Sequence, residues 1–200
     1  MSELDICNAA LIKLGADRIT ALNENNNRAR AMNARYAAVR DAELARHRWK
    51  FSIRRVTLAA LAAAPDGDDY ARQFQLPNDY IRLIEGADIA DAADLSDYRS
   101  GGRQLYSVEG RRILTNLAAP LSIRYIAQIT DTSLFVPDFA EALASRLTDE
   151  CCERITDSDS KREAAKADYK QAIREALRAR CLEAPPQQVA DDTWVMARAQ

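Results

Sequence analysis

The sequence has little of what most catalytic and metal sites are built from. Histidine occurs once among 200 residues, at His47, and this count excludes a histidine-rich metal site. No C-x-x-C pair is present for zinc, and the G-x-S-x-G, G-x-x-x-x-G-K-S/T and G-x-G-x-x-G motifs are absent. We therefore expect no catalytic residues, no cofactor site and no metal site, and we expect that the protein is not an enzyme.

Cysteine is also sparse, and its spacing does not suit a disulfide framework. Cys151 and Cys152 are adjacent, while Cys7 and Cys181 lie far apart on segments predicted to be helical. With no signal peptide at the start, we expect synthesis in a reducing host cytoplasm, where each thiol packs as a small apolar side chain. A hydrolase that uses Cys151 or Cys152 with His47 is an alternative.

Long apolar runs and bulky aromatic side chains are scarce as well. No run approaches the roughly 20 residues of a membrane span, so we expect no contact with a membrane. Aromatic residues make up 6% of the chain, and alanine supplies much of the 48% hydrophobic fraction. This composition favours close-packed helices over a bulky all-β core.

The net charge of −2 is small but unevenly distributed. Residues 24–55 are rich in Lys and Arg, whereas residues 65–100 are rich in Asp and include an acidic stretch at 88–99. The two segments are interpreted either as two solvated surfaces or as a polar axis that suits end-to-end docking or stacking of subunits.

One long amphipathic helix is predicted within residues 26–51. Three consecutive asparagines, Asn25, Asn26 and Asn27, stand where a cap of its first turn is wanted, because a short side-chain oxygen can accept from the unpaired N–H groups there. Apolar residues follow spacings of three and four along one face: Ala29, Met32, Tyr36 and Val39. After the helix the apolar period changes to two, which indicates a strand. Four side chains are expected to anchor the helix and its exit: Tyr36, His47 in a helix-end role, Trp49 and Phe51.

A shorter helix is predicted before the long one. Ser2 and Asp5 resemble a capping box with Asp in place of the usual Glu, and Gly15 suits the first residue after the helix end.

Two more helices are predicted in the last third of the chain. Pro137 suits the first helical position. Ser160 and Glu163 match the S-x-x-E capping box of a final helix that we expect to run to about Leu182.

The middle of the chain has the pattern of strands and turns. Glu109-Gly110 is the strongest hairpin signal, and short links with local pairing favour an antiparallel sheet. Candidate strands cover 50–58, 71–76, 80–84, 104–108, 112–116 and 122–129, and the acidic stretch 88–99 is interpreted as a surface loop or short helix.

These segments predict an α+β protein. Residues 1–49 and 134–184 would form a discontinuous four-helix bundle, because their apolar stripes can be buried only against one another. Residues 50–133 would form an inserted antiparallel β module. Residues 185–200 would form an extended C-terminal tail, in which an apolar cluster suits docking on a neighbour or partner: Trp194, Val195 and Met196.

The N-terminal quarter resembles the phage head-to-tail adaptors, the tail tubular protein A family that includes the gatekeeper proteins of short-tailed phages. The resemblance covers about 50 of 200 residues. Arg48 stands where such segments often have proline or glycine. The matching residues are Asn8-Ala9-Ala10-Leu11-Ile12-Lys13-Leu14-Gly15, Ile19, Leu22, Ala29, Ala31 to Tyr36, Arg40-Asp41, Leu44 and His47-Arg48-Trp49-Lys50-Phe51.

The resemblance implies a structural virion protein at the head–tail junction with no cofactor. Such proteins form a ring, commonly twelvefold, beneath the portal protein; they extend the DNA channel and provide a platform for a downstream tail or nozzle protein. Their helical part faces the portal, their β part points toward the tail, and C-terminal segments can clamp the portal or a neighbour. Genomic DNA passes through the channel without sequence-specific binding.

Three arginines of the long helix are candidates for contacts with another subunit or the portal: Arg28, Arg30 and Arg35. Contact with DNA in the channel is a weaker interpretation, because strong phosphate contacts would hold a polymer that has to slide.

A different class remains open, a small DNA-binding regulator that uses the basic helix around residues 28–55. The sequence lacks the spacing of a helix-turn-helix, and the acidic middle would repel DNA.

Overall fold

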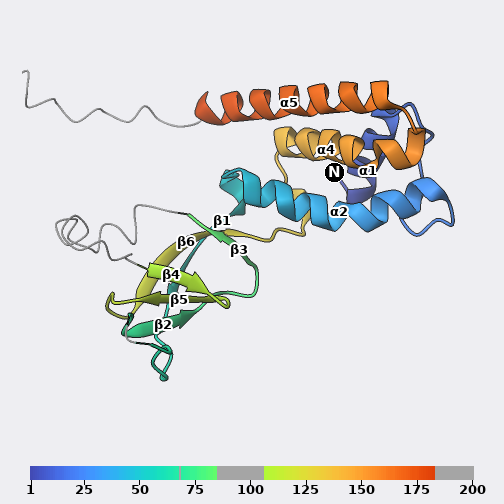
Figure 1. The fold of residues 1–200 in the computed structure, drawn as a ribbon. Helices are drawn as coiled ribbons and strands as arrows, with labels where there is room; N and C mark the ends of the chain where they lie inside the picture. The colour runs from blue at the N-terminus through green and yellow to red at the C-terminus, as the bar shows by residue number, and fades with distance from the viewer. Residues whose placement is uncertain (68, 85–105, 183–200) are drawn as a thin grey trace, which may run out of the picture.

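A computed structural model describes residues 1–67, 69–84 and 106–182 of the chain, with the side chains of 180–182 excepted. The described residues form four α-helices and two antiparallel three-stranded sheets, so the predicted α+β class is confirmed (Figure 1). The predicted tail 185–200 with Trp194, Val195 and Met196, and the acidic stretch 88–99, lie outside the described residues.

Helix α1 spans Glu3–Lys13, and its ends agree with the sequence signals. The hydroxyl of Ser2 accepts a hydrogen bond from the Asp5 N–H, and the Asp5 carboxylate accepts one from the Ser2 N–H, which completes the capping box. Gly15 has a φ of +70°, and its N–H donates to the Ile12 carbonyl over 2.8 Å. The Ala16 N–H donates to the Leu11 carbonyl, so the helix ends in the predicted left-handed turn.

Helix α2 spans Asn27–Arg46, and of the three asparagines predicted to cap it Asn26 does so, by accepting from the Ala29 N–H over 2.7 Å. The face predicted to be apolar is buried, including Met32 and Tyr36. The chain leaves the helix at His47, which is extended.

Helix α4, Pro137–Thr156, packs against the other three helices. Pro137 takes one of the first two helical positions, where the missing N–H costs no helical hydrogen bond. Figure 1 shows α4 between α5 on one side and α1 and α2 on the other. This central position explains why α4 carries more buried residues than the other helices: Phe139, Ala140, Ala142, Leu143, Ala144, Ser145, Leu147, Thr148, Cys151 and Cys152.

Helix α5 is described over Asp159–Leu182, up to the last described residue, so its predicted end stays a prediction, whereas its predicted capping box is wrong. Ser160 lies inside the helix. The Ser158 carbonyl already accepts a helical hydrogen bond from the Arg162 N–H over 3.2 Å. The helix therefore begins before the S-x-x-E pattern.

The strands pair in two sheets, whereas the sequence suggested one. The first sheet has the order β1 (Ile53–Leu58), β6 (Leu121–Ala127), β3 (Tyr80–Leu83), and the second has the order β2 (Arg72–Gln75), β5 (Arg112–Thr115), β4 (Tyr106–Glu109). The sheets separate because β6 pairs with β1 and β3 while β5 pairs with β2 and β4. Which strands lie side by side is decided by long-range packing, which local alternation does not encode.

One predicted strand begins later than expected, and the predicted hairpin is confirmed. The segment Lys50–Ser52 is a short 3-10 turn, so the strand predicted from residue 50 begins at Ile53. The hairpin between β4 and β5 is confirmed: Gly110 and Arg111 both have positive φ, 51° and 63°, which is the geometry that matches the twist of two paired strands.

Candidate subunit interface

The three candidate arginines of α2 lie at exposed or half-exposed positions, and the structure gives each a partner in its own chain. Arg28 forms an ion pair of 3.0 Å with Asp17, and Arg30 donates to the Asn25 side-chain oxygen. Arg35 pairs with Glu150 of α4 over 2.7 Å. Arg28 lies in the first turn of α2, at the positive pole of the helix dipole. That turn contains no acidic residue. Asp17 supplies the negative charge that this position would otherwise lack.

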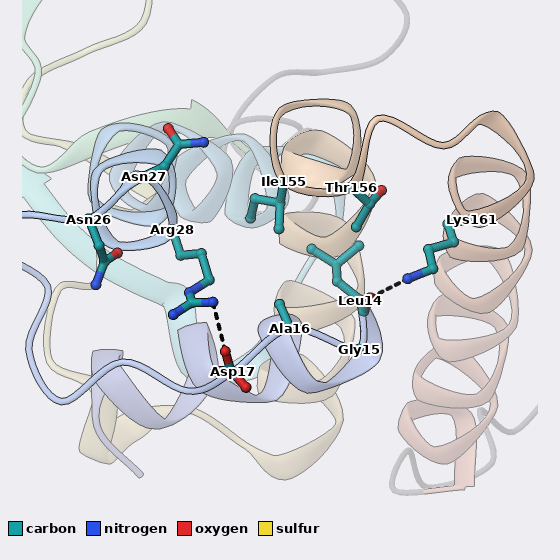
Figure 2. A pocket seen from close by; sticks show the side chains of 10 residues that line it. All are labelled: Leu14, Gly15, Ala16, Asp17, Asn26, Asn27, Arg28, Ile155, Thr156 and Lys161. Carbon is teal, nitrogen blue, oxygen red and sulfur yellow. Dashed lines mark hydrogen bonds and ion pairs between the residues drawn. The ribbon is translucent and has the colours of Figure 1, made fainter.

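Arg28 lies on the rim of a pocket of about 480 Å³ at one end of the helical part (Figure 2). The pocket lies where the end of α1, the start of α2, the end of α4 and the start of α5 meet. Apolar side chains and charged groups both line it: Leu14, Gly15, Ala16, Asp17, Asn26, Asn27, Arg28, Ile155, Thr156 and Lys161. On the far side the Lys161 ammonium donates to the Leu14 carbonyl over 3.0 Å and thereby caps the end of α1. A pocket with an apolar lining and both signs of charge suits one side chain of a bound peptide and its polar neighbours.

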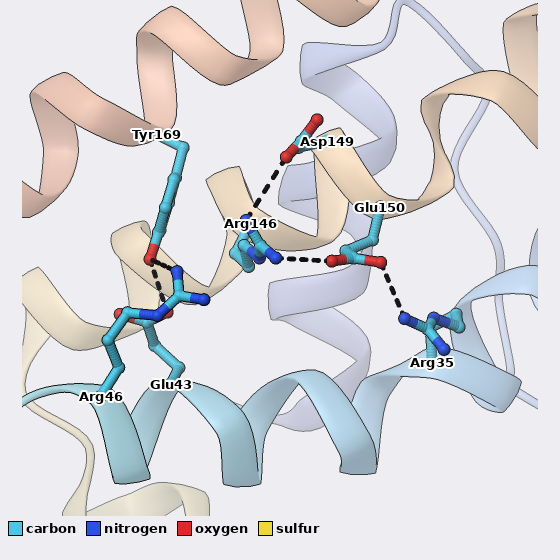
Figure 3. A network of polar contacts seen from close by, with 7 residues as sticks. All are labelled: Arg35, Glu43, Arg46, Arg146, Asp149, Glu150 and Tyr169. Carbon is cyan, nitrogen blue, oxygen red and sulfur yellow. Dashed lines mark hydrogen bonds and ion pairs between the residues drawn. The ribbon is translucent and has the colours of Figure 1, made fainter.

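Arg35 belongs to a polar network that joins α2 to α4 (Figure 3). Glu150 accepts from Arg35 and also from Arg146, each over 2.7 Å. Arg146 makes a longer contact of 3.5 Å with Asp149. Glu150 and Arg146 are each about 25% exposed, so the network is partly shielded from water and its ion pairs are screened less than those on an open surface.

The same network reaches α5 through Tyr169. The Tyr169 hydroxyl donates to the Glu43 carboxylate over 2.8 Å and accepts from Arg46 over 3.0 Å. The Arg146 guanidinium lies 5.2 Å from the centre of the Tyr169 ring, within the range of a cation–π contact. Three helices therefore meet at one tyrosine.

Glu43 is the buried charge of this network, with an exposed fraction of 1%. One carboxylate oxygen accepts from Tyr169, and the other lies 3.6 Å from the His47 side chain. Burial raises the pKa of Glu43 above its ordinary value, against the opposing effects of Tyr169, Arg46 and Arg146. Burial, followed by the nearby Glu43 carboxylate, raises the pKa of Tyr169 to about 12.

No protein-family model matches the chain, and no curated protein sequence matches it either.

Three of the four predicted anchors, His47, Trp49 and Phe51, occupy the junction between the helices and the sheets. Trp49 is buried, meets the Phe139 ring edge-on at 5.0 Å, and donates through its indole N–H to the Glu43 carbonyl over 3.2 Å. Phe51 meets the same Phe139 ring at 5.0 Å. His47 lies edge-on to Trp49 at 6.0 Å. Tyr36 is buried in the middle of α2, and the Arg40 guanidinium lies 6.0 Å from the centre of its ring.

Among the described residues, Cys151 does not form the thiol–histidine pair that a hydrolase with His47 requires. The Cys151 thiol lies 3.9 Å from the Ala31 carbonyl, about 24 Å along α2 from His47 at 1.5 Å per residue. Burial raises the pKa of Cys7 to about 12 and that of Cys151 to about 11, whereas a nucleophile needs a lowered thiol pKa. Of the described helices, none combines the length and the apolar character needed to cross a membrane.

The contact between Glu43 and Tyr169 was not predicted from the sequence. A signal for Glu43 was present: it falls on the buried face of α2, seven residues after Tyr36, where an apolar side chain would be expected. Nothing in the sequence indicated that Tyr169, far along the chain, would supply its hydrogen bond.

Proposed function

We propose that this protein is a structural head-to-tail adaptor of a phage virion, which forms a ring beneath the portal, extends the DNA channel and carries the tail. The proposal rests on the structural roles that residues of the adaptor-like N-terminal segment have in this fold, above all Asn8. The Asn8 side chain donates to the Ile19 carbonyl over 3.0 Å and accepts from the Ile19 N–H over 2.8 Å. One side chain thus fixes the connector after α1, and Asn8 and Ile19 both belong to the segment that resembles the adaptors.

Two further residues of the segment that resembles the adaptors, Gly15 and Trp49, also have structural roles. Gly15 supplies the left-handed turn that ends α1, and Trp49 joins the end of α2 to α4. Residues in these roles specify a backbone arrangement rather than chemistry, so their presence supports a shared fold with the adaptors.

In the proposed arrangement the four helices act as one bundle, built from residues 1–49 and 134–184, with residues 50–133 inserted between the halves. The bundle faces the portal and the β module points toward the tail or nozzle protein. Residues 185–200 form the docking tail, with Trp194 as its apolar anchor. The ring number expected from the resemblance is twelve, and DNA passes through the ring without sequence-specific binding.

The paired arginines argue against the alternative of a DNA-binding regulator. Arg28 and Arg35 are neutralised by carboxylates of their own chain, and Arg54 pairs with Asp79 over 2.7 Å. Phosphate binding depends on positive charge that is available to release counterions. A salt-dependent shift of duplex DNA by the purified protein would nevertheless favour the regulator over the adaptor.

Electron microscopy of the protein with the portal protein of the same virus tests the proposal. We expect a ring of this protein on the portal, with its helices toward the portal and its sheets away from it. A protein that stays apart from the portal at micromolar concentrations of both would contradict the proposal.

A further inference from the structure

The turn between α4 and α5 is short and unfavourable for the residue that makes it. Only Asp157 and Ser158 separate Thr156, the last residue of α4, from Asp159, the first of α5. Asp157 has φ 47° and ψ 42°, in the left-handed region. A side chain with a Cβ atom is crowded against the backbone there, and helices that end this way usually have glycine at that position, with Asn and Asp next in preference.

The alternative to the turn is a continuous helix, and the sequence permits it. No glycine or proline occurs between Asp138 and Ala184. If Asp157 and Ser158 took helical angles, α4 and α5 would become one straight helix from Pro137 to Leu182, about 69 Å long.

Helix α5 is held by little apolar surface. Among its described side chains, the buried ones are Ala165, Tyr169 and Ala176, and two of these are alanines. Its main packing partner is α4. Because burial free energy scales with apolar area, α5 is the helix whose detachment costs least.

Lys161 attaches the start of α5 to the Leu14 carbonyl. A second polar attachment, in the middle of the helix, is the contact of Tyr169 with Glu43 and with the Arg146 guanidinium. This contact is specific, because the buried Glu43 carboxylate requires a donor. An α5 from a second copy presents the same tyrosine and the same stripe, so it satisfies Glu43 equally well.

We infer that copies of this chain exchange α5 through the hinge Asp157–Ser158. In the exchanged form α4 and α5 are continuous, and Tyr169 of one copy binds Glu43 of the next. All contacts that α5 leaves in its own chain are made again in another, while the unfavourable turn is removed. Passed from each copy to the next, α5 links subunits head to tail, which closes a ring when the rotation between copies permits. The inference rests on the self-association part of the proposed function.

Two substitutions at one position test the hinge in opposite directions. Asp157→Gly relieves the left-handed turn and weakens the continuous helix, so we expect the dissociation constant of the oligomer to rise roughly tenfold per hinge. Asp157→Ala disfavours the turn and favours the helix, so we expect the constant to fall by roughly the same factor. Sedimentation equilibrium of the full chain measures both. Asp69→Gly and Asp69→Ala, in an exposed loop of the β part, are the matched controls and should change nothing.

A photo-reactive benzoylphenylalanine in place of Ile173, a partly buried residue of α5 that packs against the core, reports the exchange directly and leaves the Tyr169–Glu43 contact intact. In a closed monomer it cross-links within its own chain, and in an exchanged oligomer it joins two chains, which a denaturing gel separates. We expect joined chains in the oligomer fraction and unjoined chains in the monomer fraction.

The outcomes separate this inference from the adaptor function. Oligomers that respond equally to Asp157→Gly and Asp157→Ala, with cross-links only within chains, would overturn the exchange and leave the adaptor standing. Exchanged oligomers that ignore the portal would support the exchange and contradict the adaptor. Wild-type and Asp157→Ala proteins that remain monomeric at every concentration and on the portal would overturn the exchange.

Discussion

The hydroxyl of Tyr169 on α5 donates a hydrogen bond of 2.8 Å to the buried carboxylate of Glu43 on α2. The two residues are 126 positions apart in the sequence, and they join the first part of the chain to the last. Their contact is the most direct link between α5 and α2, so its removal tests how the two ends of the chain are held together.

Tyr169→Phe should destabilise the protein by about 1–3 kcal/mol, because the Glu43 carboxylate loses a donor in a buried site. Urea unfolding followed by circular dichroism measures the change. A double-mutant cycle with Glu43→Leu isolates this contact from the other effects of each substitution, including the loss of the Arg46 hydrogen bond to the hydroxyl. If the two substitutions simply add, the hydrogen bond contributes nothing to stability.

Glu43→Gln should become more favourable, relative to wild type, as the pH rises. Burial raises the pKa of folded Glu43 above the ordinary value of 4.5, so the folded state binds a proton that the unfolded state releases. The stability contributed by Glu43 is therefore present below about pH 4.5 and is lost as the pH rises through the raised pKa. Unfolding of both proteins at pH 4, 6 and 8 gives the difference. A difference that is the same at all three values would show that Glu43 does not titrate in this range.

Phe139→Ala should cost about 3–5 kcal/mol of unfolding free energy, since it empties the centre of the aromatic cluster that Trp49 and Phe51 contact. Val108→Ala, at an exposed strand position, is the control and should change stability by less than about 0.5 kcal/mol. Thermal unfolding provides both values, and a small effect at Phe139 would mean that the cluster does not join helices to sheets.

In a Cys181→Ser background, the three remaining thiols should react with a disulfide reagent only as fast as the protein opens. Burial raises the pKa values of Cys7 and Cys151 to about 12 and 11, and Cys152 is buried as well, so little thiolate is available at pH 8. Absorbance of the released thiol in native and denaturing buffer gives the ratio of rates. Rapid reaction of one thiol in the native protein would revive the thiol hydrolase as a candidate.

Trp194→Ala should weaken portal binding while the subunit folds normally, because the tail is proposed to dock through its apolar cluster. Surface plasmon resonance on immobilised portal measures the affinity, and circular dichroism checks the fold. Unchanged affinity would remove the tail from the docking mechanism.

Much of the local structure could be read from the sequence because it depends on neighbouring residues. The Ser2–Asp5 capping box, the Asn26 cap, the Gly15 turn and the Gly110 hairpin each involve atoms within a few residues of one another. The false capping box at Ser160 shows the limit of this reasoning. A local pattern identifies a possible helix start, but an earlier residue that completes the hydrogen bonds takes precedence.

The candidate interface was only partly predictable. The exposed positions of Arg28, Arg30 and Arg35 follow from the period of α2. The partner of Arg35 does not, because Glu150 comes from α4, which lies next to α2 only after the whole chain has folded.

The sequence by itself determined the α+β class, the positions of most elements, the caps that start the first two helices and the turn that ends the first, because hydrogen bonds and side-chain periodicity over a few residues carry that information. Tertiary structure alone decided the division of the strands into two sheets, the burial of Glu43 beneath Tyr169 and the left-handed turn at Asp157. Each of these depends on which distant segments exclude water from one another, and that choice is made by packing of the complete chain.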